Sequence, residues 1–325
     1  MRRRLRQPTP PLRGLMPGGD RFRADVLAGL ARAPKSLPPK YFYDAEGSRL
    51  FDAICMLPEY YLTRTEYALM QERAGEMARR LGPRVMLVEP GSGSSVKSRL
   101  LLDALEDPVA YVPVDISQEH LASSAAGVDR AYPELAVLPV AADFAEALAL
   151  PAPPRPARRA VVYFPGSTLG NFDPPAARAL LRRFRALAGV GGALLIGVDL
   201  CRDPAVLQPA YDDPGGVTAA FNRNLLARIN RELGADFEPL AFDHRAAWNE
   251  AAGCVEIHLV SRRDQIVRVA GRRFAFRRGE ALHTENSYKY EAATFEPEVA
   301  AAGFAPLRRW TDPLGRFGVF LFDTA

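Results

Sequence analysis

The sequence contains few of the residues that build metal centres and disulfide frameworks. It has three cysteines and four histidines in 325 residues. Cys55, Cys201 and Cys254 form no C-x-x-C pair, and the histidines form no H-x-x-x-H pair. We therefore expect no structural metal and no disulfide framework, and we expect a protein of the reducing cytoplasm.

Long hydrophobic runs are also absent. No stretch approaches the roughly 20 apolar residues of a membrane-spanning helix. Five arginines lie within residues 1–13, but no apolar signal-peptide region follows them. We expect residues 1–20 to form a basic, disordered tail. A transit peptide is the less favoured alternative, because the segment lacks serine and has no clear amphipathic pattern.

The remaining composition is that of an ordinary folded protein with a basic surface. Hydrophobic residues make up 48% and charged residues 25% of the chain, whose formal net charge is +4. The arginines are dispersed over predicted helix faces and loops and do not alternate with aromatic residues. This pattern favours a solvated basic surface over a nucleic-acid groove. We expect a monomer that acts on a small molecule and has neither nucleic-acid nor membrane partners.

The middle of the chain alternates between strand and helix patterns. Apolar strands are predicted at residues 84–89, 110–115, 135–143, 160–164 and 193–200. Helices are predicted between them at residues 95–105, 117–126 and 173–188. The last of these begins with Asp173 as N-cap and Pro174 at the first helical position. Buried strands that alternate with helices predict an α/β fold with a parallel, doubly wound, Rossmann-like sheet.

The segment before this region has a different character. Residues 1–62 are rich in proline and aromatic residues and show no alternation of strands and helices. Thr63 and Glu66 match a capping box, which would start a helix that extends to about Leu81. This segment is therefore predicted to be an extension that precedes the sheet.

The segment after the fifth strand also differs. A helix at residues 216–233 is expected to end at Gly234. Residues 255–276 predict an antiparallel meander, and residues 307–310 and 316–322 predict two strands that rejoin the main sheet. The N-terminal extension and this insertion could together form a lid over the carboxyl ends of the strands, where such sheets bind ligands.

A glycine-rich turn follows the first predicted strand. The segment from Glu89 to Ser95 reads EPGSGSS, and glycines there allow a tight turn and a close approach of the backbone to a ligand. Val96 stands where the dinucleotide pattern G-x-G-x-x-G has its third glycine. That difference weakens a diphosphate site and favours a ligand without phosphates, such as S-adenosylmethionine.

Acidic residues end the next two strands. Asp115 lies 24 residues after Gly91, where a carboxylate can accept hydrogen bonds from ribose hydroxyls. Asp143 could accept a hydrogen bond from the amino group of adenine, and Phe144 could lie beside the adenine ring. Any one of these acids could equally be a helix N-cap, but their succession at strand ends favours a cofactor site. NAD is the alternative cofactor, disfavoured by the missing glycine and by the lack of an obvious hydride-transfer acid–base pair.

Several longer motifs resemble the histidine Nα-methyltransferases of ergothioneine biosynthesis. They are LPPKYFYD (37–44), GS (47–48), LPEYYLTRTE (57–66), EPGSG (89–93), GSTLGN (166–171), YDD (211–213), VTAAFN (217–222) and TENS (284–287). The resemblance covers nearly the whole chain from about residue 20. It implies a class I methyltransferase core at residues 63–200 and 291–325, with a smaller α+β substrate-binding lid at residues 21–62 and 201–290.

The resemblance also implies a cofactor and a reaction. The cofactor is S-adenosylmethionine, and the reaction is trimethylation of the α-amino group of L-histidine to hercynine. The implied cofactor-binding residues are Glu89, Gly91, Ser92, Gly93, Lys97, Asp115, Asp143 and Phe144. The implied catalytic residues are Asn171, Tyr211, Tyr43 and Tyr60. The implied substrate-binding residues are Gly166, Thr218, Ile257, Glu285 and Ser287.

The resemblance assigns a role to most of these groups. Asn171 and Tyr211 would hold the amino and carboxylate groups, and the carbonyl of Gly166 would face the amine. Tyr43 and Tyr60 would line the imidazole pocket. Glu285 and Ser287, which would bind the imidazole nitrogens, lie two residues apart in a strand and therefore share a face.

The chemistry and its alternatives can be stated from the residues. Methyl transfer needs a free lone pair in line with the methyl group, so positioning should dominate, and Tyr43 or Tyr60 could relay a proton through water. On residue type alone, Glu285 would more simply pair with a surface arginine. Ile257 stands where the family is expected to have methionine, which leaves open another amino acid or amine as the acceptor. A non-catalytic, S-adenosylmethionine-binding regulatory protein is the second alternative.

Overall fold

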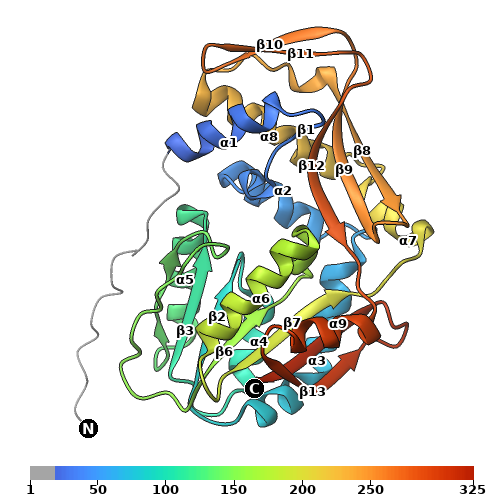
Figure 1. Ribbon diagram of the computed structural model, residues 1–325. Coiled ribbons are helices and arrows are strands. Elements are labelled where there is room, and N and C mark those ends of the chain that lie inside the picture. Colours follow the sequence, from blue (N-terminus) through green and yellow to red (C-terminus); the bar gives the residue numbers. More distant parts are fainter. Residues whose placement is uncertain (1–18) are drawn as a thin grey trace.

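The computed structural model describes residues 19–325 (Figure 1). The basic tail expected at residues 1–20 therefore lies outside the described residues, except for the first two residues of helix α1 (Gly19–Ala31). Figure 1 shows a large sheet flanked by helices in its lower half and a smaller part containing β8, β9 and β12 above it.

The large sheet has the order β13-β14-β7-β6-β2-β3-β4, with β5 also paired with β3. Its strands are β2 (Val85–Pro90), β3 (Ala110–Asp115), β4 (Ala136–Val137), β5 (Val140–Ala141), β6 (Arg159–Phe164), β7 (Ala193–Asp199), β13 (Phe304–Thr311) and β14 (Phe317–Thr324). The pairings among β2 to β7 are parallel, whereas β14 is antiparallel to β7 and to β13. Every residue of β2 and β7 is buried, as expected of central strands covered on both faces. The predicted Rossmann-like α/β fold is confirmed.

Helices cover both faces of this sheet. On one face, α3 (Tyr61–Leu81), α4 (Val96–Ala104) and α5 (Gln118–Ala131) pack with Val161 and Tyr163 of β6. On the other, α6 (Pro174–Ala188) and α9 (Ala292–Ala300) pack with Val162 and Phe164 of the same strand. Alternate side chains of one strand thus serve two hydrophobic cores. None of the helices within residues 19–325 is long and apolar enough to cross a membrane.

A smaller sheet connects the N-terminal extension with the insertion. Its order is β1-β12-β9-β8, with strands β1 (Lys35–Ser36), β8 (Phe242–Asn249), β9 (Cys254–Ser261) and β12 (Ala281–Tyr288). Because β1 pairs with β12, the extension and the insertion share one sheet.

One hydrophobic cluster unites these lid elements. It includes side chains from α1, the 3-10 turn η1 (Pro39–Phe42), α2 (Ala45–Cys55), α7 (Pro204–Tyr211), α8 (Val217–Leu233), β9 and β12. Since this core is distinct from the three cores of the large sheet, we propose the division predicted above. The lid comprises residues 21–62 and 201–290, and the sheet domain comprises residues 63–200 and 291–325.

Two strand patterns differ from their predictions. The strand predicted at residues 135–143 forms only the short β4 and β5, because Pro139 lies between them and cannot donate to a ladder. The predicted meander is wrong in its pairing. Strands β10 (Gln265–Val269) and β11 (Arg272–Phe276) form a separate hairpin, and β9 pairs with β8 and β12.

The helix ends give two confirmations and one correction. The Asp173 carboxylate accepts a hydrogen bond from the Ala176 amide (2.8 Å), and Gly234 ends α8 with a φ of 62°. The capping box is wrong, because α3 begins at Tyr61 and its N-terminus has no side-chain cap. Glu66 lies in the second turn and is fully buried, so its carboxylate serves another purpose.

Candidate functional site

One cavity gathers the side chains predicted to bind the substrate. Its lining comes from α2, α7, α8, β9 and β12, from the residues at and just before the starts of α2 and α3, and from the loop that follows β6. It includes every residue predicted for catalysis or substrate binding, namely Tyr43, Tyr60, Gly166, Asn171, Tyr211, Thr218, Ile257, Glu285 and Ser287. Residues separated by more than 200 positions in the chain thus converge on one cavity, as a substrate site requires.

An apolar wall completes the cavity and was not predicted. It consists of Phe51, Ile54, Leu62, Ala210 and Phe221. The Tyr43 ring packs edge-on against Phe51 and Phe221, with centroids 5.7 and 5.8 Å away. The three-residue spacing of Phe51 and Ile54 on α2 is a signal for a shared helix face, but it does not identify that face as a ligand wall.

Two of the three tyrosines that line the cavity, Tyr43 and Tyr60, are neutral groups. Burial raises the pKa of the Tyr43 hydroxyl and that of the Tyr60 hydroxyl well above the ordinary range. Both hydroxyls therefore remain protonated near neutral pH, where they can donate and accept hydrogen bonds but cannot act as phenolate bases.

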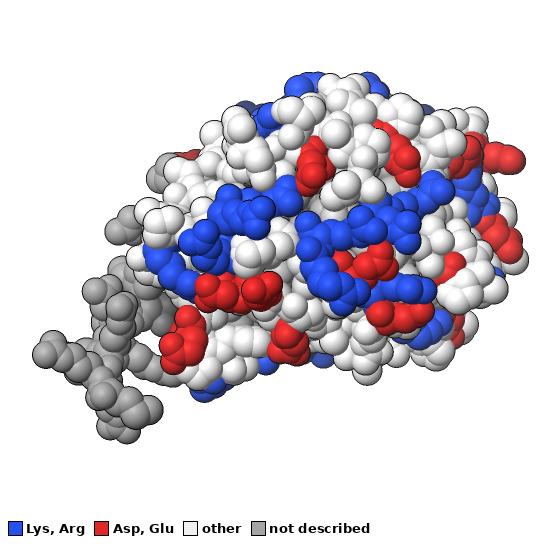
Figure 2. Space-filling view, turned by 90° about the horizontal axis from the view of Figure 1, so that it is seen from below, with Lys and Arg blue, Asp and Glu red and all other residues white. Residues whose placement is uncertain are grey.

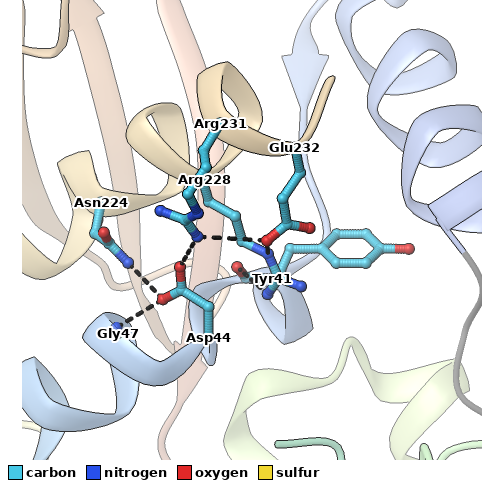
Figure 3. A network of polar contacts seen from close by, with 7 residues as sticks. All are labelled: Tyr41, Asp44, Gly47, Asn224, Arg228, Arg231 and Glu232. Carbon is cyan, nitrogen blue, oxygen red and sulfur yellow. Dashed lines mark hydrogen bonds and ion pairs between the residues drawn. The ribbon is translucent and has the colours of Figure 1, made fainter. Parts of the chain in front are cut away.

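The position of Tyr43 depends on a polar network around its neighbour Asp44 (Figure 3). The Asp44 carboxylate caps α2 through the Gly47 amide (2.7 Å) and accepts hydrogen bonds from Asn224 (2.8 Å) and Arg231 of α8. Burial alone would raise the pKa of the Asp44 carboxyl, but these hydrogen bonds outweigh it and lower the pKa. The network fixes the start of α2 to α8 beside the cavity.

Asp44→Ala should therefore destabilise the protein. The loss of a helix cap, of the buried partner Asn224 and of the exposed partner Arg231 is expected to lower the free energy of unfolding by about 1–3 kcal/mol, measured by urea denaturation. The difference from wild type should shrink as the pH falls through the lowered pKa of Asp44, because protonation removes the same stabilisation. Glu46→Ala, which removes only the exposed pair with Arg49, should change little. Equal losses from both variants at neutral pH would contradict this account.

Glu285 is the acidic group of the cavity. It lies on β12 opposite Ile257 of β9, just after a register shift in the pairing of these strands. Within residues 19–325 its carboxyl makes no hydrogen bond or ion pair, and burial raises its pKa to about 8. It does not pair with a surface arginine, which was the simpler expectation from residue type. A bulge beside an active site commonly re-aims a side chain in this way.

The loop after β6 has an unusual backbone that several groups hold in place. Gly166 and Ser167 both have positive φ angles, of 79° and 57°. The Glu66 carboxylate accepts hydrogen bonds from the Gly166 amide (2.9 and 3.1 Å) and forms an ion pair with Lys97. The Ser167 hydroxyl accepts a hydrogen bond from the Asp199 amide (2.9 Å). Glu66 was missed as a site residue because its sequence pattern imitates a capping box.

Asn171 reaches the cavity because this loop packs tightly on β12. It ends the turn η2 (Thr168–Asn171), and a Cβ atom at Gly170 would lie only 2.6 Å from the carbonyl oxygen of Tyr288. Only glycine allows the turn to approach β12 so closely. The amide of Asn171 and the carboxyl of Glu285 thereby come to line the same cavity.

The predicted cofactor loop lies at the carboxyl end of β2. Gly91 and Gly93 have φ angles of 69° and 48°, and the Gly91 amide donates to the carbonyl of Val114 (2.7 Å). Ser92 is buried, and its hydroxyl has no hydrogen-bond partner within residues 19–325. Glu89 lies beneath the loop, where it accepts hydrogen bonds from Ser98 and Tyr111, and burial raises its pKa to about 7. Glu89 therefore supports the loop.

The two strand-end acids flank this loop. Asp115 accepts the amides of Gly93 (3.1 Å) and Ser117 (2.9 Å), and burial raises its pKa. Asp143 accepts the Ala145 amide (3.0 Å) and pairs with Lys40 of the lid (3.1 Å). The Phe144 ring lies against Gly91, because a Cβ atom there would be 3.3 Å from it.

These residues fit S-adenosylmethionine. The loop offers an unpaired buried hydroxyl, an acid for ribose hydroxyls and an aromatic ring against the glycine turn. Lys97 follows the loop on α4 and reaches Glu66, so the cofactor side and the substrate side of the site meet at one ion pair.

Comparison with known proteins agrees with this geometry. The family model described as "Histidine-specific methyltransferase, SAM-dependent" matches residues 22–324. The chain is 45% identical over 305 residues to the histidine N-alpha-methyltransferase of Mycolicibacterium smegmatis and 46% identical over 309 residues to that of Mycobacterium tuberculosis. Each alignment covers 92% of this chain and 94% of the relative. Ergothioneine biosynthesis protein 1 of Neurospora crassa is 30% identical over 290 residues, which cover 86% of this chain and 32% of that protein.

Proposed function

Because this chain belongs to the family of histidine-specific, S-adenosylmethionine-dependent methyltransferases, we propose that it methylates the α-amino nitrogen of L-histidine. We propose that three methyl groups are transferred in turn, giving hercynine for ergothioneine biosynthesis. The observation that carries this proposal is the single cavity into which Glu285, Ser287, Asn171 and Tyr211 converge.

Recognition of the imidazole rests on Glu285 and Ser287. A carboxyl oxygen accepts an N–H of the ring, and a hydroxyl can donate to the other ring nitrogen. Within residues 19–325 the Glu285 carboxyl has no partner, so a ligand N–H would supply the hydrogen bond that this buried group lacks. Ile257 and the aromatic wall would enclose the ring faces.

The amino acid end of the substrate would lie toward the loop after β6. We propose that Tyr211 binds the carboxylate, that Asn171 orients the amino and carboxylate groups, and that the carbonyl of Gly166 accepts a hydrogen bond from the amine. Their fixed positions would hold the amine lone pair toward the methyl group, and such positioning is the main contribution a protein can make to this reaction.

The remaining chemistry is proton removal. S-adenosylmethionine supplies a methyl group activated on sulfur. Each transfer forms one N–C bond, breaks one S–C bond and requires one proton to leave the amine beforehand. Because Tyr43 and Tyr60 stay neutral, we propose that they orient the amine and pass its proton to water.

Mass spectrometry tests this function directly. The purified protein would be incubated with S-adenosylmethionine and each of the twenty amino acids separately. We expect one to three added methyl groups on histidine and none on the other amino acids. Methylation of a different amino acid, or of none, would refute the proposal.

The two alternatives were methylation of another amino acid or amine and a non-catalytic, S-adenosylmethionine-binding regulatory role. Neither is favoured by the family match or by the histidine methyltransferase relatives. The replacement of the expected methionine by Ile257 is an apolar change of similar volume. It therefore alters the shape of the pocket more than its chemistry.

We further propose a monomer that works in the cytoplasm without a nucleic-acid partner. The three cysteines are free thiols, two of them buried, as is usual in a reducing compartment. On the face in Figure 2, Lys and Arg side chains gather in broad patches that Asp and Glu side chains border and interrupt. Size-exclusion chromatography and a fluorescence assay with labelled RNA and DNA would test the oligomeric state and the absence of nucleic-acid binding.

A further inference from the structure

A buried lysine lies directly behind two of the proposed substrate-binding hydroxyls. Lys289 follows β12, and its side chain is fully buried. Its ammonium group lies 2.6 Å from the Tyr211 hydroxyl, 3.0 Å from the Ser287 hydroxyl and 2.7 Å from the Asp199 carboxylate. An ammonium group has three hydrogens and accepts none, so these three contacts use its full capacity.

Asp199 keeps this lysine charged. Burial alone would lower the pKa of Lys289, but Asp199 and Tyr211 outweigh it and raise the pKa. Asp199 ends β7, is itself fully buried and accepts the Tyr61 hydroxyl (2.7 Å) and the Cys201 amide (3.0 Å). The ion pair is therefore anchored to the large sheet, while Tyr211 and Ser287 belong to the lid.

The arrangement determines what the hydroxyls can offer a ligand. The oxygens of Tyr211 and Ser287 both accept from Lys289 and lie 2.8 Å apart. Each hydroxyl carries one hydrogen, and at most one of the two can lie between them. At least one hydroxyl hydrogen is therefore left to donate into the cavity. With the Lys289 cation behind it, the Tyr211 hydroxyl suits an anionic acceptor, as a substrate carboxylate is.

We propose that Lys289 is a positioning residue that holds the Tyr211 hydroxyl as a hydrogen-bond donor toward the substrate carboxylate and thereby favours the binding of substrates that carry a carboxylate. This inference rests on the proposed function, because it assumes that Tyr211 meets the carboxylate of histidine. No sequence motif had singled out Lys289 or Asp199. Their role becomes visible only when β7, α7 and β12 are brought together.

The test compares histidine with histamine, which has the same imidazole but no carboxylate. Lys289→Met alone would leave Asp199 without its cation and could fail to fold, so the double variant Lys289→Met with Asp199→Asn removes both charges together. Dissociation constants for histidine, histamine and S-adenosylhomocysteine would be measured by calorimetry, with thermal unfolding as the check on folding. The matched control is Lys35→Met with Glu280→Gln, which removes a lysine–glutamate ion pair beside β1 and β12, outside the cavity lining.

We expect the double variant to bind histidine about 10–100-fold more weakly, a loss typical of hydrogen bonds to a charged group. Binding of histamine should weaken by less than binding of histidine, because histamine has no carboxylate for Tyr211 to meet. Binding of S-adenosylhomocysteine should change by less than about threefold, and the control should match wild type. Unchanged histidine affinity in a folded double variant, or an equal loss for histidine and histamine, would overturn the proposal. If the wild-type protein failed to methylate histidine, the proposed function itself would be refuted, which is a separate result.

Discussion

Glu285→Ala is expected to lower kcat/KM for histidine by about 10²–10⁴-fold, because a site built to hydrogen-bond a polar substrate group discriminates strongly once its partner is removed. Glu285 is the acidic residue of the cavity lining, and its carboxyl has no partner within residues 19–325. Steady-state kinetics with varied histidine would measure the loss. The affinity for S-adenosylhomocysteine should not change, because the predicted cofactor loop lies on the large sheet.

Glu256→Gln is the matched control for this substitution. Glu256 lies on the neighbouring strand β9, where it accepts a hydrogen bond from Asn249 and does not line the cavity. Its replacement should leave histidine turnover unchanged. Retention of wild-type kinetics by Glu285→Ala would show that the imidazole is held elsewhere.

Glu285 should also make the protein less stable as the pH rises. Burial raises its pKa from 4.5 to about 8, so the folded state keeps the proton over a range in which the unfolded chain has released it. Stability is therefore lost between about pH 4.5 and pH 8. Glu285→Gln has no such group and should exceed wild type by about 1–4 kcal/mol at pH 8, with no gain at pH 4. Urea denaturation at the two pH values measures this, and an equal gain at both would rule out titration as the cause.

The parts of the fold that the sequence predicts well have local causes. Strand β3 is an apolar run bounded by turns, and α6 begins at an Asp-Pro pair that pre-forms its first turn. The positions of the cofactor loop and of Asp115 can be predicted because each directly follows a strand, and the carboxyl ends of parallel strands meet at one edge of the sheet. The substrate residues were available only through the family resemblance, since residues as distant as Tyr43 and Glu285 meet only in the folded chain.

What the sequence could not predict depends on tertiary contacts. Lys289 and Asp199 look like ordinary surface charges in the sequence, yet both are fully buried. The pairing of Asp143 with Lys40 joins the cofactor site to the lid across about 100 residues. Strands β10 and β11 show the same alternation of apolar and polar residues as a strand of a continuous meander would. Nothing in the local sequence reveals that β9 pairs with β12 and not with β10.

Glu66 is the clearest case in which local pattern and tertiary structure disagree, and its removal should have the second large effect. Glu66→Ala leaves the Gly166 amide without an acceptor and Lys97 without its partner. Loss of one member of such a buried pair is expected to lower the free energy of unfolding by about 3 kcal/mol or more. It should also lower kcat by about 10²-fold, because a small displacement of the Gly166 carbonyl misplaces the amine.

Glu66→Gln and Gly197→Ala separate the two contributions. Glutamine retains an acceptor for the Gly166 amide but not the charge for Lys97, so its kcat should lie between those of wild type and Glu66→Ala. A Cβ atom at Gly197 would lie 2.2 Å from the Glu66 carboxylate, so Gly197→Ala should displace Glu66 and resemble Glu66→Ala without touching the cavity. Gly75→Ala, on the exposed side of α3, has room for its Cβ atom and should retain full activity. If Gly197→Ala and Glu66→Gln both kept the wild-type kcat, the carbonyl of Gly166 would be positioned by the strand end and the Ser167 turn alone, and the buried glutamate would serve only stability.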